Sequence, residues 1–431
     1  MRRSKFYPLA AAATVLTLTL AACSGGSDDD SGSGSGKGKT LDVWIMKGTN
    51  PDSEPFFADV AKAFKEETGA TLKVEYVEWA DAHDRFVTAI AGGTTPDVAE
   101  TGTTWTPEFA DAGALAPLDD YVKKDGLGDD LVKGLVDAGT YNDKLYGMPW
   151  YAGVRSLVYR SDLFDKLGLK APTTWAELQA DAQAIKKANP KMSGVAVPGD
   201  AEFTVYPWVW GAGGQVATQS GGQWTSGLDS AEARKGISFW TGLATQDKLS
   251  SAGATTWKET DVLDAFANGD VGMAVMGSWT PAAITEKNPE MKGKFAAVPI
   301  PGETGGIAPS VLGGSHLSMF NTAKDKDLAW DFIKLMTTGK FAQQWADQSG
   351  YFPGQTSLLD KATKSTDPLV APFAKQFVDG GASVPVSPNF GAVQAKKTTS
   401  VMMQAILSGK ESVDDATTAA AQEMTSLLNG K

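Results

Sequence analysis

The stretch from Thr40 to Val98 switches repeatedly between strand-like and helix-like patterns, and this alternation constrains the fold more than any other feature of the sequence. Alternating apolar and polar residues indicate half-buried strands, whereas apolar residues four apart indicate one face of a helix. The strand patterns cover 40–46, 71–77 and 96–98, and the helix patterns carry Phe56, Val60, Phe64, Phe86 and Ile90. Strand–helix–strand alternation predicts an α/β lobe with a mostly parallel sheet.

The rest of the chain mixes both patterns and ends in helices. A strand is predicted at 154–159, and Thr174 and Glu177 form the ends of a capping box that opens a helix running to about Ala188. A helix is expected at 261–267 and a buried strand at 271–276. The tail carries apolar helix faces, which comprise Leu328, Phe332, Leu335 and Met336, and later Val413, Ala416, Ala420, Met424 and Leu427.

Length and charge narrow the class of protein. At 42% hydrophobic residues the chain is globular. About 390 residues follow the N-terminal region, more than one hydrophobic core usually serves, so two lobes are expected. The net charge of -12 leaves no basic stripe to neutralise phosphates, which argues against a nucleic-acid partner and against a strongly anionic ligand.

Cys23 is the single cysteine, and it comes directly after a segment that has the pattern of an export signal. Residues 1–5 are basic, residues 6–22 are apolar, and the ending Leu-Ala-Ala-Cys resembles a bacterial lipobox. A transmembrane anchor is the alternative, but the run is at the lower limit for crossing a bilayer and has no cationic flank behind it. We therefore expect a signal peptide at 1–22 and lipidation at Cys23, which would also explain an unpaired cysteine in an exported protein.

The Ser/Gly/Asp-rich stretch behind Cys23 is expected to be a tether. Residues 23–39 would comprise the lipidated cysteine and a flexible coil with a reach on the order of 20 Å. The protein would then sit on the extracytoplasmic face of the bacterial cell membrane, in contact with the membrane through its lipid anchor only.

The chain has 13 tryptophans, and their placement suggests a binding cleft. Helical patterns make core positions the expectation for Trp175, Trp240 and Trp330, and Trp44 and Trp79 lie in or just after strands. Six others lie where strands give way to loops: Trp105, Trp150, Trp208, Trp210, Trp257 and Trp279. Ligands in open α/β sheets bind beyond the carboxyl ends of strands. A flat aromatic face suits a sugar ring. Any one of these side chains could be a core or rim residue, but as a group they predict that at least two line a ligand cleft.

A resemblance to a known family covers nearly the whole of the chain after the tether. The matching segments are 92–98 (GGTTPDV), 141–149 (YNDKLYGMP), 156–164 (SLVYRSDLF), 172–178 (PTTWAEL), 266–273 (FANGDVGM) through 277–279 (GSW), and 329–335 (AWDFIKL). In this order and spacing, behind a lipobox, the chain resembles an extracellular solute-binding lipoprotein of a carbohydrate ABC importer, similar to the maltose-binding group (family 1).

The resemblance implies an α/β fold of the two-lobe periplasmic-binding-protein-like kind (type II), with a hinge between the lobes and a helical C-terminal section. Lobe 1 would comprise 40–150 with 307–350, lobe 2 would comprise 151–306, and 351–431 would be helices packing on both lobes. The chain would cross between lobes near 149–154 and return near 301–315.

The same resemblance implies a function without catalysis. The protein would bind a neutral mono- or oligosaccharide between the lobes, close around it, and deliver it to ABC permease subunits. We expect it to act as a monomer, with no cofactor and no metal.

Individual site residues follow from the resemblance, position by position. Trp279 matches a position where such proteins commonly stack a sugar. Thr103, Thr104 and Trp105 match a loop that contributes polar and aromatic contacts. The remaining expected ligand-binding residues are Tyr151, Arg155, Glu202, Tyr206, Trp208, Gly313, Gly314 and Phe352, the last of these after Tyr351 at the floor of the cleft. Gly153 departs from the family pattern, because an acidic contact is expected at that position, and this leaves the specific sugar undefined.

Enzyme functions have less support from the sequence. The chain has two histidines: His83 lies in a charged helical start, and His316 could touch ligand or make a structural hydrogen bond. The chain contains no Gly-x-Ser-x-Gly elbow, His-Glu-x-x-His pair or phosphate loop. A secreted glycosidase or polysaccharide lyase with an aromatic cleft remains the main alternative, because its paired carboxylates would leave no short sequence motif. A binder of peptides, polyamines or iron is the third interpretation.

Overall fold

The computed structural model describes residues 36–48 and 52–431. The predicted signal peptide, Cys23 and the tether as far as residue 35 lie outside the described residues. The last part of the expected tether forms a turn instead of a flexible coil. Gly36 is buried and its N–H donates to the Thr68 carbonyl at 3.1 Å, and Lys39 N–H donates back to Gly36 O at 2.9 Å.

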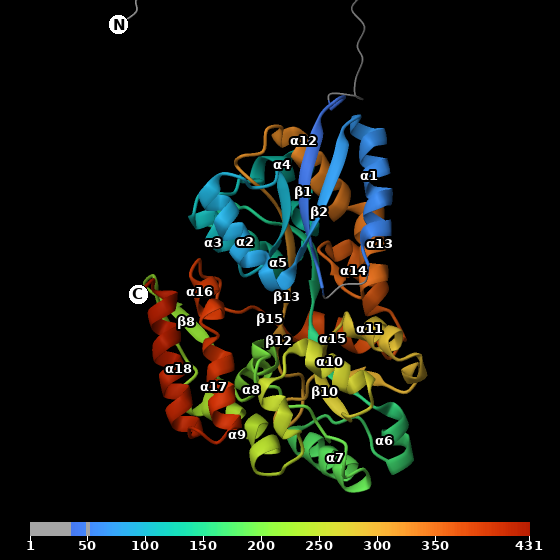
Figure 1. Ribbon diagram of the computed structural model, residues 1–431, viewed down its shortest axis with the longest axis vertical. Helices are drawn as coiled ribbons and strands as arrows, with labels where there is room; N and C mark the ends of the chain where they lie inside the picture. Colours follow the sequence, from blue (N-terminus) through green and yellow to red (C-terminus); the bar gives the residue numbers. More distant parts are fainter. Residues whose placement is uncertain (1–35, 49–51) are drawn as a thin grey trace, which may run out of the picture. The chain divides into compact units, whose positions relative to one another are not determined.

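A six-stranded sheet organises one lobe, which we call the large-sheet lobe (Figure 1). Its strands, in spatial order, are β14 (Phe352–Pro353), β6 (Met148–Gly153), β13 (Gly313–Met319), β3 (Val98–Gly102), β1 (Thr40–Lys47) and β2 (Thr71–Glu78). β1 pairs in parallel with β2 and β3, whereas β13 runs antiparallel to β3 and β6. The predicted parallel α/β unit is therefore present, and strands from much later in the chain extend it.

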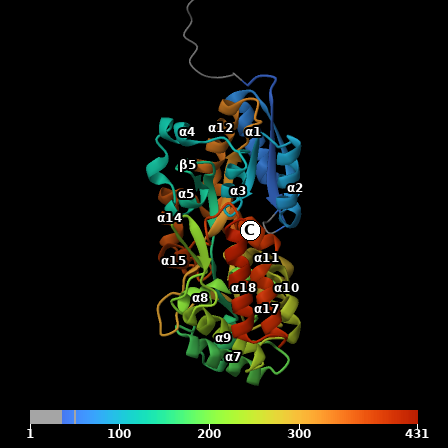
Figure 2. The ribbon, with the colours of Figure 1, turned by 90° about the vertical axis from the view of Figure 1, so that its left-hand side faces the viewer.

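Helices from two separate parts of the sequence, residues 54–139 and 326–349, cover the large sheet. They are α1 (Glu54–Thr68), α2 (Trp79–Gly92), α3 (Thr106–Asp111), α4 (Asp119–Lys124), α5 (Lys133–Gly139), α12 (Lys326–Thr337) and α13 (Gly339–Ser349), with the short hairpin β4 (Thr140–Tyr141) and β5 (Lys144–Leu145). α1 ends at Thr68, because Gly69 adopts a left-handed conformation (φ 76°) and its N–H caps Lys65 O. Figure 2 shows α12 beside α1, and the two helices are in contact.

A three-stranded antiparallel sheet organises the small-sheet lobe. Its strands are β10 (Met273–Gly277), β7 (Arg155–Tyr159) and β11 (Ala296–Val298). Around it lie α6 (Ser161–Leu167), α7 (Trp175–Ala188), α8 (Tyr206–Gly211), α9 (Ala231–Thr245), α10 (Glu259–Ala267) and α11 (Thr280–Lys287), with the hairpin β8 (Ala217–Ser220) and β9 (Gln223–Ser226). Thr174 caps α7 as expected, since its Oγ1 accepts from Glu177 N–H. The Glu177 carboxylate accepts from Thr173 N–H at 2.7 Å and not from Thr174 N–H, so only half of the predicted capping box forms.

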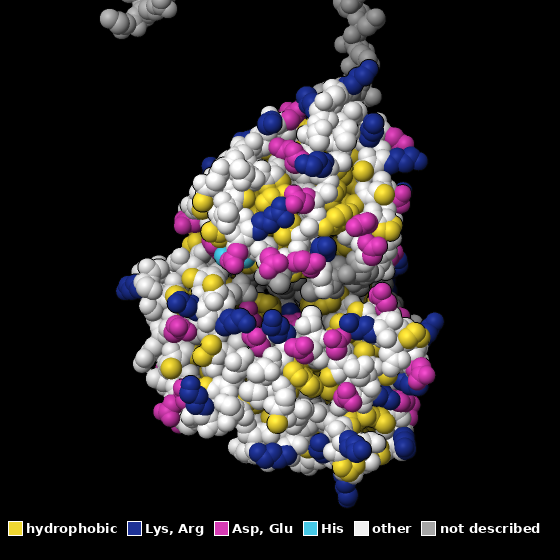
Figure 3. Space-filling model, viewed as in Figure 1, with side chains coloured by type: hydrophobic (Ala, Val, Ile, Leu, Met, Phe, Trp, Pro, Cys, Tyr) yellow, Lys and Arg dark blue, Asp and Glu magenta, His cyan; other side chains and the backbone are white. Residues whose placement is uncertain are grey.

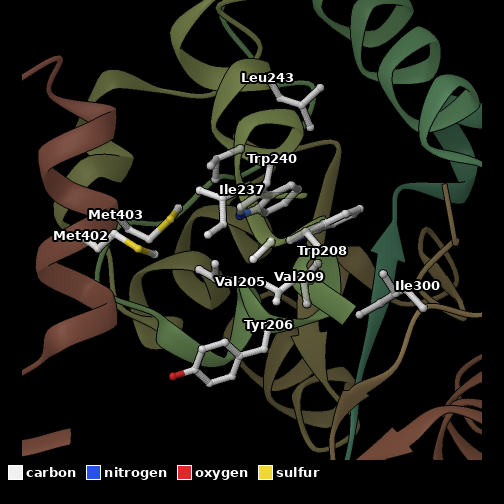
Figure 4. Packing of buried hydrophobic residues seen from close by; sticks show 14 of the residues in the cluster. Val205, Tyr206, Trp208, Val209, Ile237, Trp240, Leu243, Ile300, Met402 and Met403 are labelled. Carbon is white, nitrogen blue, oxygen red and sulfur yellow. The ribbon is translucent and has the colours of Figure 1, made fainter. Parts of the chain in front are cut away.

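The core of the small-sheet lobe centres on two stacked indoles (Figure 4). Trp208 on α8 and Trp240 on α9 are fully buried, with ring centroids 4.5 Å apart and planes 15° apart. α9 approaches this closely because Gly236 has no side chain: a Cβ there would lie 2.0 Å from Trp208 O. Met402 and Met403, which belong to α17 (Thr398–Leu407), pack against this core from one side.

The chain passes between the two sheets through very short connections. β6 ends at Gly153 and β7 begins at Arg155, so Val154 alone separates a strand of the large sheet from a strand of the small sheet. The return runs from β11 to β13 through β12 (Ser310–Val311), which pairs in parallel with β15 (Gly381–Ala382).

The C-terminal section contacts elements of both sheets. α14 (Thr356–Thr363) packs against β14 of the large sheet, and α15 (Ala371–Gly380) packs against β7 and β11 of the small sheet. α16 (Phe390–Ala395), α17 and α18 (Val413–Leu428) follow, and both α17 and α18 contact α9. Figure 2 shows α17 and α18 side by side next to α9. None of the helices in the described parts of the chain is long and apolar enough to be a candidate for crossing a membrane.

Candidate functional site

A cavity of about 800 Å³ lies between the two sheets and takes its walls from both lobes. The large-sheet lobe supplies Trp79, Thr103, Thr104, Trp105, Tyr151, Gly313, Gly314, Ser315 and Tyr351, and the small-sheet lobe supplies Arg155, Phe203, Glu259, Thr260 and Trp279. Figure 3 shows the molecule hollowed across the level where the two lobes meet. This volume lies within the range of small-molecule sites.

Trp279 forms the central aromatic wall of the cavity. It follows β10 and is the N-cap residue of α11, and it stacks on Tyr351 with centroids 5.0 Å apart and planes 18° apart. Two glycines make room for the indole: a Cβ on Gly153 would lie 2.5 Å from its ring, and one on Gly277 would lie 2.3 Å from it. The family resemblance led us to expect an acidic side chain at position 153. The space beside Gly153 is instead occupied by the Trp279 ring, which belongs to the other lobe.

Arg155 is held beside this wall by Glu259, the first residue of α10. Its Nε and Nη2 both donate to Glu259 Oε1, at 3.0 and 2.7 Å, and Nη2 also donates to Oε2 at 3.0 Å. The guanidinium lies over the rings of Phe203 and Trp279, 4.8 and 5.2 Å from their centroids. The buried cation is thus neutralised and fixed in orientation, and its aromatic neighbours confine it to the cavity wall.

A buried carboxyl group supports the large-sheet side of the cavity. Glu100 on β3 is fully buried and accepts hydrogen bonds from Tyr151 Oη, from Ser315 Oγ at 2.5 Å, and from Met46 N–H at 2.8 Å. Burial raises the pKa of Glu100 to about 7, against the lowering effect of these donors. Tyr151 and Ser315 line the cavity, so Glu100 fixes two wall residues from behind.

The loop after β3 and the start of β13 both contribute to the cavity wall. Thr103, Thr104, Trp105, Gly313 and Gly314 all line the cavity. Thr103 N–H donates to Gly314 O at 3.1 Å, which ties the loop to the return strand. Gly314 is required by close approach, because a Cβ there would lie 2.1 Å from a backbone oxygen of β6.

Four expected ligand-binding residues are not among those that line the cavity. Tyr206 and Trp208 are fully buried in the small-sheet core, where Trp208 Nε1–H donates to Thr204 O at 3.0 Å and Tyr206 Oη bonds Thr399 Oγ1 at 2.9 Å. Phe352 packs on Phe377, with centroids 5.0 Å apart. These placements correct the sequence analysis: local hydrogen bonds and core packing, not a cleft, take up these side chains.

Glu202 lies behind the cavity wall and reaches it through one neighbour. Gln394 of α16 lines the cavity and donates from Nε2 to Glu202 Oε1 at 2.7 Å. Burial raises the pKa of Glu202 to about 7, although Gln394 and the charge of Arg155 both favour its ionised form. In this structure Glu202 is placed to orient Gln394, not to form the wall itself.

Both histidines are structural in their contacts. His83 Nε2 lies 2.9 Å from Glu108 Oε2, and that carboxylate raises the pKa of His83. His316 is fully buried, with Nδ1 2.8 Å from Thr106 Oγ1 and Nε2 3.0 Å from Leu135 O. Of the two interpretations of His316, the structure supports the structural hydrogen bond. Among the residues that the structure describes, no group of His, Cys, Asp and Glu is arranged to hold a metal ion.

His316 should make the stability of the fold depend on pH. Burial lowers the pKa of His316 to about 4, whereas an unfolded histidine titrates near 6.5. The unfolded state therefore binds more protons between these values, so the contribution of His316 is complete above pH 6.5 and is lost as pH falls toward 4. The limiting slope is about 1.4 kcal/mol per pH unit.

Urea denaturation of the wild type and His316→Gln from pH 8 to 4 measures this effect. The difference in free energy of unfolding between the two proteins should shrink steadily below pH 6.5. Taking the difference removes the contributions of Glu100 and Glu202, whose raised pKa values act in the opposite direction. A difference that stays constant with pH would show that His316 titrates normally in the folded state.

Arg155→Ala should weaken ligand binding at least tenfold, equivalent to about 1.4 kcal/mol, because it removes the oriented cation and leaves Glu259 unpaired in the wall. Arg155→Lys should not restore affinity, since an ammonium cannot reproduce the two-nitrogen contact. Arg160→Ala is the matched control: Arg160 pairs with Asp162 at 2.6 Å and does not line the cavity. Calorimetric affinities that match for the two alanine variants would make Arg155 purely structural.

Some residues of the site gave little sequence signal. Glu259 is the first residue of an amphipathic helix, where an acidic residue is common and does not indicate a binding site. Gln394 belongs to the C-terminal section, far along the chain from the other wall residues. Phe203 lines the cavity, whereas its neighbour Glu202 was the residue expected there, so the prediction missed it by one position. Phe203, Glu259 and Gln394 are far apart in the sequence and meet at the cavity only in the folded protein.

The fold and the site define a two-lobe binding protein, and comparison with known sequences gives its family. The family model of the bacterial extracellular solute-binding proteins matches residues 48–342. The chain belongs to this family, whose members bind solutes outside the cytoplasm.

Individual relatives agree with that assignment. A putative binding protein of Brucella abortus is 30% identical over 386 residues, covering 87% of this chain and 90% of the relative. The diacetylchitobiose-binding protein DasA of Streptomyces coelicolor is 28% identical over 88% of this chain and 87% of its own. The crystal structure of an ABC transporter solute-binding protein from Thermotoga lettingae, bound with α-D-tagatose, superposes with a TM-score of 0.80 at 27% identity, covering 90% of this chain and 100% of the other. The two-lobe fold expected from the sequence is confirmed.

Proposed function

We propose that this protein captures a neutral saccharide in the cavity between its lobes and delivers it, unaltered, to an ABC permease. The observation that carries the proposal is the arrangement of Trp279, Tyr351 and Trp105 around one cavity together with Arg155 and polar backbone. Aromatic faces accept the C–H face of a sugar ring, while the guanidinium, threonine hydroxyls and bare backbone of Gly313–Gly314 can bond its hydroxyls. The saccharides in the names of the Streptomyces and Thermotoga relatives support the same class of ligand.

Closure would follow from the way the ligand contacts both lobes. Trp105 belongs to the large-sheet lobe and Trp279 to the small-sheet lobe, so a bound saccharide gains its full set of contacts only when the lobes are together. Binding then shifts the open–closed equilibrium by the difference in affinity between the two states. We infer that Val154 and the return segment form the hinge, and that a permease recognises the closed form of a monomer.

Attachment to the membrane completes the proposal. Lipidation of Cys23 after removal of 1–22 would hold the protein at the extracytoplasmic face of the membrane, where released sugar is taken up. Mass spectrometry of the protein from its own membrane should find a diacylated N-terminal cysteine. An unmodified N-terminus upstream of Cys23 would contradict this part of the proposal.

A saccharide panel tests the proposed function. Diacetylchitobiose, maltotriose, lactose and D-tagatose would be titrated by calorimetry and by tryptophan fluorescence. We expect saturable binding of at least one of them with a dissociation constant near micromolar, about -8 kcal/mol. Chromatography of the sugar after prolonged incubation should show no new reducing ends. New reducing ends would indicate a glycosidase, and the absence of saturable binding across a wider saccharide panel would refute saccharide capture.

A further inference from the structure

A second hollow, lined by two tryptophans, lies on the small-sheet lobe outside the main cavity. Its volume is about 310 Å³, and its walls include Trp210 of α8, Trp224 of β9, Gln215 and Gln219. This volume lies at the lower end of the range for small-molecule sites. The residues 383–386, which we call the strap, form its remaining wall.

The indoles of this outer hollow are neither core nor fully exposed. Trp210 and Trp224 are both half-buried, in contrast to Trp208, two residues before Trp210, which is fully buried. Gln219 pairs directly with Trp224 across the β8–β9 hairpin, so the amide and the indole lie on the same face of it. Trp210 is one of the six tryptophans that the sequence places where strands give way to loops, and it does not line the main cavity.

Trp224 is also held rigidly by the C-terminal helix. Asn429 Oδ1 accepts from Trp224 N–H at 3.0 Å, and Asn429 Nδ2 donates to Trp224 O at 2.8 Å. On the same hairpin, Ser226 N–H donates to Thr425 Oγ1 at 2.9 Å. The indole is therefore presented from a backbone fixed at several points, as a preorganised contact residue requires.

The chemistry of the lining selects a neutral, hydroxyl-rich ligand. None of the described residues that line the outer hollow carries a charge. Two indole faces offer apolar stacking surfaces, and the Gln215 and Gln219 amides, both exposed, together with the Ser383 hydroxyl, offer both donors and acceptors. Indole faces beside amide and hydroxyl groups match a sugar ring, which has an apolar C–H face and hydroxyls at its edge.

The strap separates this hollow from the main cavity. Val384 lines both, and the strap also borders a separate recess of about 10 Å³ together with Thr103 and Thr104 of the main cavity wall. A recess of this size has room for about one water molecule and none for a sugar ring. We propose that the outer hollow is a second carbohydrate-binding site, separate from the main cavity, which takes one unit of a neutral saccharide between Trp210 and Trp224.

Fluorine NMR of protein labelled with 5-fluorotryptophan tests this proposal. The 13 indole signals would be assigned by single Trp→Phe variants and followed during titration with diacetylchitobiose, maltotriose and lactose, up to high millimolar concentration. We expect the signals of Trp210 and Trp224 to shift together with one dissociation constant, different from the one that governs Trp105 and Trp279. Trp257, half-buried and outside both sites, is the internal control.

Trp224→Ala separates the two sites. It should weaken the outer binding event at least tenfold and leave the midpoint for Trp279 within about twofold. Shifts at Trp105 and Trp279 without any at Trp210 and Trp224, for all three sugars, would overturn the second site while supporting the main one. Shifts confined to Trp210 and Trp224 would support the second site and count against the proposed function.

Discussion

Trp279→Ala should reduce saccharide affinity at least tenfold while leaving the fold intact. The indole stacks on Tyr351 and carries the guanidinium of Arg155 near its face, so its removal takes away a stacking surface and loosens two neighbours. A tenfold loss corresponds to about 1.4 kcal/mol, which lies within the range expected for losing an aromatic contact and its buried area. Calorimetry with the preferred sugar of the panel measures the effect, and circular dichroism checks the fold.

Two further variants make this result specific. Trp257→Ala removes an indole that does not line the cavity, so its affinity should stay within about twofold of wild type. Gly153→Ala keeps the indole but places a methyl group in its seat, 2.5 Å from the ring, and should therefore also lower affinity. Equal affinities for Trp279→Ala and wild type would remove this residue from the binding surface.

Trp208→Ala should instead lower stability, by about 3–5 kcal/mol, the range for truncating a buried tryptophan. It would leave a void against Trp240 and remove the indole donor to Thr204 O. The free energy of unfolding from urea denaturation measures the loss. The folded fraction should bind sugar with nearly unchanged affinity, because Trp208 does not line the cavity.

The neighbouring indole provides the comparison. Trp210→Ala, two residues along α8, truncates a half-buried side chain and should cost clearly less stability. The opposite pattern for Trp208→Ala, an unchanged free energy of unfolding with a large loss of affinity, would restore Trp208 to the ligand-binding surface and show that this part of the structure rearranges on binding.

The sequence predicted the fold well where periodicity was clear. Helical spacing identified Trp175, Trp240 and Trp330 as core residues, and all three are buried. β1, β2 and α7 were predicted to within about one residue of their ends, whereas β3 begins two residues later and ends four residues later than predicted. The order of the strands in the large sheet could not be derived from periodicity, since β13 and β14 join it from late in the chain.

The candidate site was harder to predict, for two physical reasons. In α8, the segment Tyr206 to Trp210 is apolar on every side, so no pattern distinguishes the buried Trp208 from the half-buried Trp210. At Tyr351 and Phe352, successive side chains point to opposite faces, so an error of one residue exchanges a wall residue for a core residue. Tyr351 lines the cavity and Phe352 packs on Phe377 instead.

The topology of the large sheet has a consequence for how the molecule matures. β3 pairs with β13, and β6 pairs with β14. Strands near residues 100 and 150 can therefore complete their pairing only with segments beyond residue 310. Pairings between segments so far apart in the sequence form slowly, because closing a large loop costs conformational entropy before any stabilising contact is made. Ligand capture should thus be among the last properties to appear during refolding.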